Sequence, residues 1–268
     1  RRPPRQDPPP PDTPPQELAR AYGRGLKGIR IRALLVFFLA LLSLVQVLIP
    51  MLGLHWTTPL DQPALQCWIA VVLLGAGILL SADALLSGLV RLFRLHVEMD
   101  TLVVFSCLAT LADGVMLALS PEAPERLPYT LVCLTGLFFL LHGAYHRKCG
   151  LRLACRTAAA TATPYRVTLD EGKWSGRDTY AKWSGSSEGF GSQIQSTDGS
   201  QTIFRRVCPL FLLGSAVLAV YVSVGLGHPE RFIWALSALF TATASFGGML
   251  AYHRPFHKLT RRLAQSGA

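Results

Sequence analysis

Residues 64–119 read ALQCWIAVVLLGAGILLSADALLSGLVRLFRLHVEMDTLVVFSCLATLADGVMLAL and contain two long apolar runs joined by a short polar turn. Asp83 interrupts the first run, Ala64–Val90, and Asp113 interrupts the second, Thr101–Leu119. A helix needs roughly 20 apolar residues to cross a bilayer core of about 30 Å, and both runs have about that length. We therefore predict a helical hairpin inside a membrane. The alternative, two fully buried helices in a large soluble domain, fits less well because neither run shows a regular polar face.

The composition also favours a membrane protein. Of the 268 residues, 50% are hydrophobic and 16% are charged, whereas about a quarter of the residues in a typical soluble domain are charged. The net charge of +10 lies between the apolar runs and forms no continuous basic face, so nucleic acid is not an expected partner. The expected partners are the lipid bilayer and, for a transporter, a metal cation. The sequence does not identify a cofactor or a protein partner, and both are left open.

The whole chain predicts an all-α integral membrane protein with six transmembrane helices and a small cytoplasmic insertion, in part β, after the fourth. The six spans are Ala33–Leu54, Ala64–Val90, Thr101–Leu119, Leu127–Leu141, Val207–Leu226 and Phe232–Tyr252. All 26 Lys and Arg residues except Arg126 and Arg231 then fall on one side. Because Lys and Arg concentrate in cytoplasmic loops, we expect both termini in the cytoplasm, and we expect the membrane to be a bacterial plasma membrane.

The segments outside the spans divide into four. Residues 1–16 predict a proline-rich, disordered tail, either a plain spacer or a ligand for a proline-reading domain. Residues 17–32 predict a basic amphipathic helix on an anionic membrane surface. Residues 142–206 form the insertion, and residues 253–268 form a basic cytoplasmic tail.

The insertion predicts a small hairpin. Its alternating residues Tyr165–Leu169 indicate a strand, and Asp170–Gly172 indicates a turn into a second strand. A segment of about sixty residues is marginal for a core of its own.

Carboxylates inside a membrane are costly and are therefore functional candidates. Asp83 is expected near the cytoplasmic interface, where Arg91 or Arg94 would neutralise it, so pairing and function are both open. Asp113 is about 18 Å deep at 1.5 Å per residue, and its own run contains no cation. It is a candidate for a cation pathway or for a hydrogen bond between helices.

Histidine and cysteine give no metal site by spacing alone. His142 and His146 stand one helical turn apart, as do His253 and His257, but a structural zinc site usually needs four ligands and a catalytic site three. The six cysteines form no CxxC pair and are interpreted as buried or cytosolic thiols. The chain contains no GxxxxGK[ST], GxSxG or HExxH sequence, so no residue is assigned to catalysis.

One further motif suggests a family. Met99-Asp100-Thr101-Leu102 opens the third predicted span, and the insertion follows the fourth. In this layout the chain resembles the membrane domain of heavy-metal-transporting P-type ATPases. The resemblance implies two extra helices before the core, an actuator domain in the insertion and an ion-binding sixth span.

The chain departs from that family at its functional sequences. Ala244–Gly248 has neither the Cys nor the Pro of the family's Cys-Pro-Cys. The actuator's Thr-Gly-Glu is absent from residues 142–206, and the phosphorylated Asp-Lys-Thr-Gly-Thr would lie beyond Ala268. We therefore expect a degenerate or truncated relative, which would be an ATPase only as part of a longer protein.

For a cation pathway we single out Asp83, Asp113, Ser245, Gly247 and Gly248. The Gly247-Gly248 pair would let the sixth helix unwind and expose carbonyl groups, or it would form a small-residue packing surface. The alternative function is a noncatalytic, membrane-anchored interaction or regulatory protein.

Overall fold

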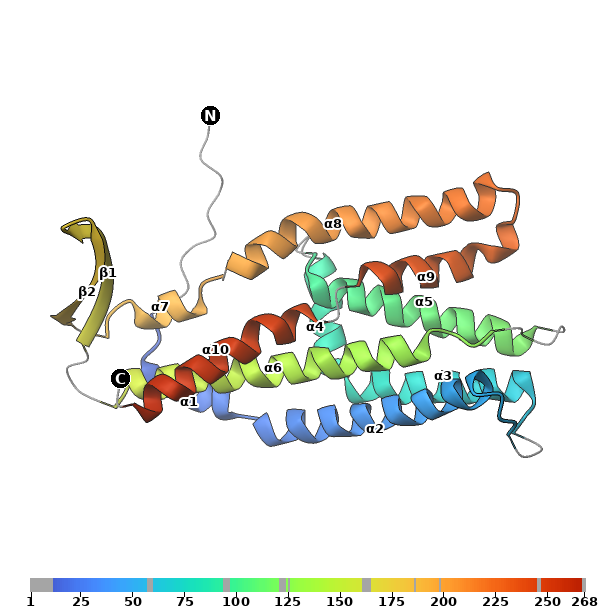
Figure 1. Cartoon of the computed structure of the whole chain (residues 1–268), viewed down its shortest axis with the longest axis horizontal. Helices are drawn as coiled ribbons and strands as arrows, with labels where there is room; N and C mark the ends of the chain where they lie inside the picture. Colours follow the sequence, from blue (N-terminus) through green and yellow to red (C-terminus); the bar gives the residue numbers. More distant parts are fainter. Residues whose placement is uncertain are drawn as a thin grey trace. The chain divides into compact units, whose positions relative to one another are not determined.

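The computed structural model describes residues 12–56, 60–93, 97–120, 124, 126–160, 165–185, 187–197, 199–244 and 247–266. Most of them are helical (Figure 1). The elements are α1 (Pro15–Gly23), α2 (Leu26–Met51), α3 (Pro63–Leu80), α4 (Ala82–Phe93), α5 (Met99–Leu119), α6 (Thr130–Ala158), β1 (Tyr165–Trp174), β2 (Arg177–Ser184), α7 (Phe190–Gln195), α8 (Gly199–Val220), the π-helix η1 (Tyr221–Gly225), the 3₁₀-helix η2 (Pro229–Arg231), α9 (Phe232–Thr243) and α10 (Gly248–Gln265).

The chain divides into two compact units. The larger, here called the membrane unit, consists of residues 27–145 and 199–253. The smaller, here called the hairpin unit, consists of residues 1–26, 146–198 and 254–268. Helices α6 and α10 each contribute residues to both units.

Among the described residues, five helical stretches are long and apolar enough to cross a membrane. They lie within Pro15–Met51, Pro63–Leu80, Met99–Leu119, Gln201–Gly225 and Pro229–Gln265. The helical membrane class is therefore confirmed. Helix α6 is not one of the five, because His142, His146 and Arg147 follow soon after its apolar first half. The count of six spans stays a prediction.

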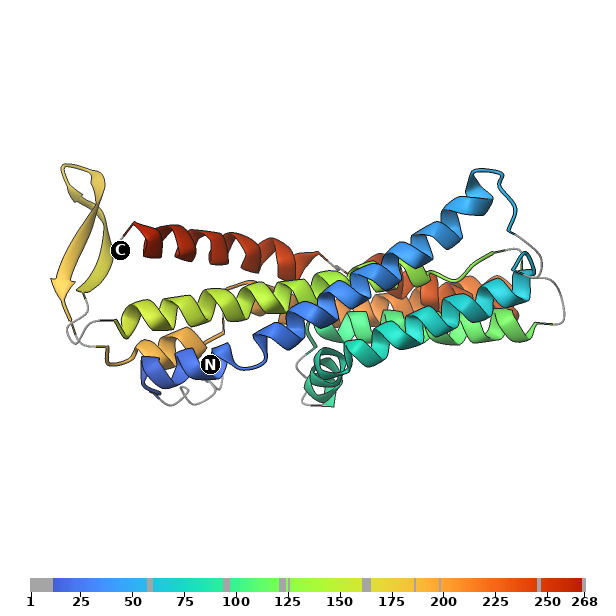
Figure 2. The same cartoon turned by 90° about the horizontal axis from the view of Figure 1, so that it is seen from below.

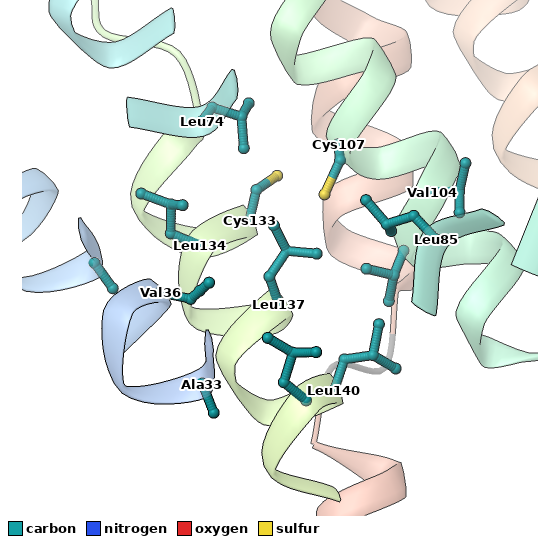
Figure 3. Packing of buried hydrophobic residues seen from close by; sticks show 13 residues of the cluster. Ala33, Val36, Leu74, Leu85, Val104, Cys107, Cys133, Leu134, Leu137 and Leu140 are labelled. Carbon is teal, nitrogen blue, oxygen red and sulfur yellow. The ribbon is translucent and has the colours of Figure 1, made fainter. Parts of the chain in front are cut away.

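Helix α5 is the central helix of the membrane unit. Of its most apolar stretch, 56% is buried inside the protein, against 22–31% for the other four stretches. It packs against α3, α4, α8 and α9. The main apolar core joins Val36 of α2, Leu74 of α3, Val104 of α5 and Leu137 of α6 (Figure 3). The outer faces of α2 and α8 carry exposed Leu, Phe and Val side chains, as lipid-facing helices do.

The single second span expected over Ala64–Val90 is wrong, because the helix stops at Leu80. Ser81 leaves helical geometry (φ −103°, ψ 9°), and its carbonyl accepts hydrogen bonds from the N–H groups of Ala84 and Leu85. Figures 1 and 2 show α4 turned away from the line of α3. Along α4, Asp83, Ser87 and Arg91 recur every four residues and form one polar face. A helix continuing through lipid would not carry such a face.

The sixth span is also interrupted. Helix α9 ends at Thr243, Ala244 is extended (φ −68°, ψ 106°), and α10 begins at Gly248. Gly248 itself is the first residue of α10, and the Gly247 carbonyl accepts a hydrogen bond from the Ala251 N–H at 2.8 Å, so the exposure of carbonyl groups at this pair stays a prediction. Ser245 lies outside the described residues.

The hairpin unit contains the expected β structure. Strands β1 and β2 pair antiparallel from Tyr165 opposite Ser184 to Trp174 opposite Arg177. The turn is at Ser175 and Gly176, later than the expected Asp170–Gly172, because both residues adopt positive φ (47° and 75°) as a two-residue hairpin turn requires. An irregularity in the strand register lies between Asp170 and Trp174 instead.

The amphipathic helix expected over residues 17–32 is divided as well. Gly25 has φ +75°, so α1 ends at Gly23 and α2 begins at Leu26. Asp12, next to α1, accepts hydrogen bonds from the N–H groups of Gly189 and Gly191 at the start of α7. These backbone hydrogen bonds lower the pKa of the Asp12 carboxyl.

A hydroxyl seam between α5 and α9 as the candidate functional site

Four buried hydroxyl groups join α5 to α9. Ser106 and Thr110 stand four residues apart on α5, and Ser237 and Thr241 stand four apart on α9, so each pair lies on one helix face. Ser106 Oγ lies 3.0 Å from Thr241 Oγ1, and Thr110 Oγ1 lies 3.0 Å from Ser237 Oγ. We call these four residues the hydroxyl seam. Because each hydroxyl both donates and accepts, the seam satisfies its members without water.

Cys133 of α6 adds a thiol to the seam. Its Sγ donates to Thr110 Oγ1 at 3.3 Å and lies 3.5 Å from Ser106 Oγ. Cys107 of α5 is also fully buried, and its sulfur points toward that of Cys133 (Figure 3). Both thiols are free. Thiolates suit soft metal ions, but the described residues bring together no group of three His, Cys, Asp or Glu side chains that would hold a metal.

Asp113 continues the same face of α5 by one further turn, and it is neutralised. Arg126, in the connection before α6, donates from Nη2 to Oδ1 at 2.6 Å and from Nη1 to Oδ2 at 2.7 Å. The Arg126 guanidinium carbon lies 5.7 Å from the centre of the Trp234 ring of α9. Two parallel hydrogen bonds to a buried carboxylate make a strong, directional ion pair. The sequence did not indicate it, because Arg126 lies outside the apolar run of Asp113.

A second set of ion pairs lies at the opposite end of α5. Arg91 of α4 donates to Glu98 at 2.6 Å and to Asp100 at 3.0 Å, and Arg205 of α8 donates to Glu98 at 2.9 Å. Glu98 and Thr101 also form a capping box at the helix start. Glu98 and Arg205 were not singled out from the sequence. The nearest signal was the Met99–Leu102 motif, whose Asp100 takes part.

Asp83 does not belong to the seam. Its carboxylate pairs with Arg32 of α2, and its side chain is 77% exposed. The expectation that Arg91 would neutralise it is wrong, since Arg91 binds Glu98 and Asp100. Arg94 lies outside the described residues. An exposed pair of this kind contributes at most about 1 kcal/mol.

The two glycines at the interruption differ. A Cβ on Gly248 would collide with Met99, the first residue of α5, whereas around Gly247 there is open space. Gly248 therefore serves as a close packing point for α5, as the small-residue interpretation expected.

Comparisons of this chain with protein-family models, with curated proteins and with solved structures found no match. The geometry of the membrane unit is the basis for a functional conclusion. That geometry is a file of hydroxyl and thiol groups inside the membrane unit, with an Arg–carboxylate pair beyond each end. Such a file is suited to binding two helices to each other or to relaying a proton. It could also offer oxygen ligands if the hydrogen bonds Ser106–Thr241 and Thr110–Ser237, here called the rungs, separate.

Proposed function

We propose that this chain is the membrane domain of a cation transporter similar to the heavy-metal P-type ATPases. The order of elements supports the proposal. A hairpin insertion follows α6, and the Met99–Leu102 motif opens α5. In the proposed orientation, both termini lie on the cytoplasmic side of a bacterial plasma membrane.

The observation that carries the proposal is the interruption between α9 and α10 at the head of the hydroxyl seam. Thr241 of the seam lies three residues before the extended Ala244. Interrupted helices in transporters present unpaired carbonyl groups to cations near the middle of the membrane. In the described conformation the rungs are hydrogen-bonded and Asp113 is paired with Arg126, so the path is closed. Transport then requires α9 to move away from α5.

Flux into proteoliposomes tests the proposal. With Zn²⁺ or Cu⁺ outside and a metal-sensitive dye inside, the unaltered chain should admit at least one of the two ions faster than empty liposomes do. Thr110→Val keeps the side-chain shape and removes an oxygen ligand from the opened path, so it should lower the flux about ten-fold, equivalent to about 1.4 kcal/mol in the barrier. Asp113→Asn should lower it as well.

The matched control is Ser223→Ala. Ser223 is a buried serine of η1, and its hydroxyl donates to the Ala219 carbonyl of the same helical stretch. Its loss should leave the flux unchanged. Flux equal to that of empty liposomes for both ions, or equal losses in Thr110→Val and Ser223→Ala, would contradict the proposal.

The alternative function is a membrane-anchored interaction protein, and one observation favours it. The β1–β2 hairpin exposes Tyr165, Tyr180 and Trp183, which are 64%, 78% and 59% accessible. Exposed aromatic side chains are typical of binding surfaces. Two results together would favour this second function. The chain would show no cation flux, and it would retain a cytoplasmic protein through this hairpin, with the retention lost in Tyr180→Ser.

A further inference from the structure

A groove lies between α2 and α6 in the membrane unit. Its volume is about 280 Å³, and its lining includes Arg30, Leu34 and Phe37 from α2 and Phe138, His142 and Tyr145 from α6. The rings along its α6 side form a continuous stack, since His142 lies 5.4 Å from Phe138 and 6.3 Å from Tyr145 between ring centres. The ring of Phe37 on α2 packs against the ring of Phe138, with 5.1 Å between the ring centres.

The polar and apolar residues of the groove separate along its length. On α2 the order from Arg30 through Leu34 to Phe37 runs from charged to apolar. On α6 the order from Tyr145 through His142 to Phe138 does the same in the opposite chain direction. Seven residues of helix span about 10 Å. The groove thus has a cationic, hydrogen-bonding end and an apolar end, and no acidic side chain lines it.

The groove opens on a surface that faces lipid. Leu34, Phe37 and Phe38 are all exposed, although each is a large hydrophobic residue in a helix apolar enough to span the membrane. On such a face a hydrocarbon chain fills a groove more favourably than water does, because apolar walls offer water no hydrogen bonds.

We propose that this groove binds an anionic glycerophospholipid. The phosphate lies at Arg30, within reach of the His142 ring and the Tyr145 hydroxyl, and an acyl chain lies along Leu34, Phe37 and Phe138. Charge complementarity selects this occupant, because basic pockets between transmembrane helices bind acidic headgroups, while aromatic walls accept a hydrocarbon chain. The inference goes beyond the proposed transport function and does not depend on it.

Native mass spectrometry of the full chain tests the proposal. Protein is released from nanodiscs holding equal amounts of phosphatidylglycerol and phosphatidylcholine, and the lipid that stays bound is counted. Phosphatidylglycerol should be retained preferentially. Arg30→Gln should lower its retention about five-fold, the effect of one cation near an anionic lipid.

Lys27→Gln is the matched control, since it removes one exposed positive charge from the same helix, one turn away and outside the groove lining. It should change retention less than two-fold. Leu34→Trp fills the apolar half and should reduce retention while leaving the charge intact. Millimolar inorganic phosphate should not displace the lipid.

Three results would overturn the inference. Equal losses of phosphatidylglycerol retention in Lys27→Gln and Arg30→Gln would mean that general surface charge, and not the groove, attracts the lipid. Equal retention of both lipids would remove the headgroup selection. Displacement by inorganic phosphate would indicate a phosphate site without a lipid chain.

Discussion

The hydroxyl of Ser106 lies 3.0 Å from the hydroxyl of Thr241, although 135 positions separate the two residues in the chain. Four residues along each helix, Thr110 meets Ser237 at the same distance. In the other direction the same antiparallel register brings Met99 against Gly248. The first residue of α10 is thus packed against the first residue of α5.

The first prediction concerns the strength of one rung. Ser106→Ala and Thr241→Val should each lower the free energy of unfolding, and the double variant should lose less than the sum. We expect a coupling energy of about 0.6 kcal/mol and not above about 1.7 kcal/mol, the range of hydrogen bonds between membrane helices. Unfolding in mixed micelles with added SDS measures all four proteins. Strict additivity would mean that the rung contributes nothing.

The second prediction concerns the Asp113–Arg126 pair. Arg126→Gln leaves a carboxylate buried at 3% exposure without its cation. We expect destabilisation of about 3 kcal/mol, the low end for a broken buried pair, because the Arg126 side chain is one-third exposed. The double variant Asp113→Leu/Arg126→Leu should recover most of that loss. Thermal unfolding in detergent compares the two, and a double variant less stable than Arg126→Gln would contradict the explanation.

The third prediction concerns the contact between Gly248 and Met99. Gly248→Leu places a side chain where the Met99 thioether lies and should destabilise the membrane unit by about 1–3 kcal/mol, as overpacking does. Because the colliding atoms are the end of a flexible side chain, Met99→Ala in the same protein should restore part of the loss. Gly247→Leu meets open space and serves as the control. The same thermal unfolding assay applies, and equal effects at the two glycines would contradict the packing role.

The fourth prediction concerns pH and the hairpin unit. His146 Nδ1 of α6 lies 2.8 Å from His257 Nδ1 of α10, so one ring donates to the other and the two cannot both be protonated in this geometry. Burial, with a contribution from Arg261, lowers the pKa of His257 below its ordinary 6.5. The unfolded chain therefore binds more protons around that pH. The stabilisation is complete above about pH 6.5 and is lost as pH falls below it.

Hydrogen exchange of the α10 amides measures this effect. Protection of residues 254–265 should fall between about pH 7.5 and 5.5, relative to the intrinsic exchange rate. In His257→Gln the fall should be smaller. His55, an exposed residue of the membrane unit, provides His55→Gln as the control. A pH dependence unchanged in His257→Gln would refute the role of the pair.

The sequence predicted those features that depend on local pattern. The apolar runs gave α3 and α5, and alternation from Tyr165 gave β1. The end of α3 before Ser81 was not predicted, because the apolar residues continue through α4 and hide its polar face. That face is recognisable only when Asp83, Ser87 and Arg91 are considered as part of a separate helix. The hairpin turn was misplaced because Asp170–Gly172 has turn composition, whereas the strands pair around Ser175 and Gly176.

The site depended on contacts that no local pattern encodes. Asp113 was singled out correctly as a buried carboxylate, but its partner Arg126 is 13 residues away in a connection. Ser237 and Thr241 lie in an apolar helix, and single hydroxyl residues do not interrupt an apolar sequence pattern enough to be recognised as a site. Only the antiparallel register of α5 and α9 turns them into a continuous file.

The joint between α3 and α4 has a consequence for movement. Within the described parts of the chain, the Ser81 hydroxyl is buried and makes no hydrogen bond. An unsatisfied buried hydroxyl costs about 1–3 kcal/mol, and a change in the angle of α4 that let water or a lipid headgroup reach Ser81 would recover that free energy. A tilt of α4 about Ser81 would therefore recover free energy at this joint, which offsets part of the cost of breaking the hydrogen bonds that join α4 to α5.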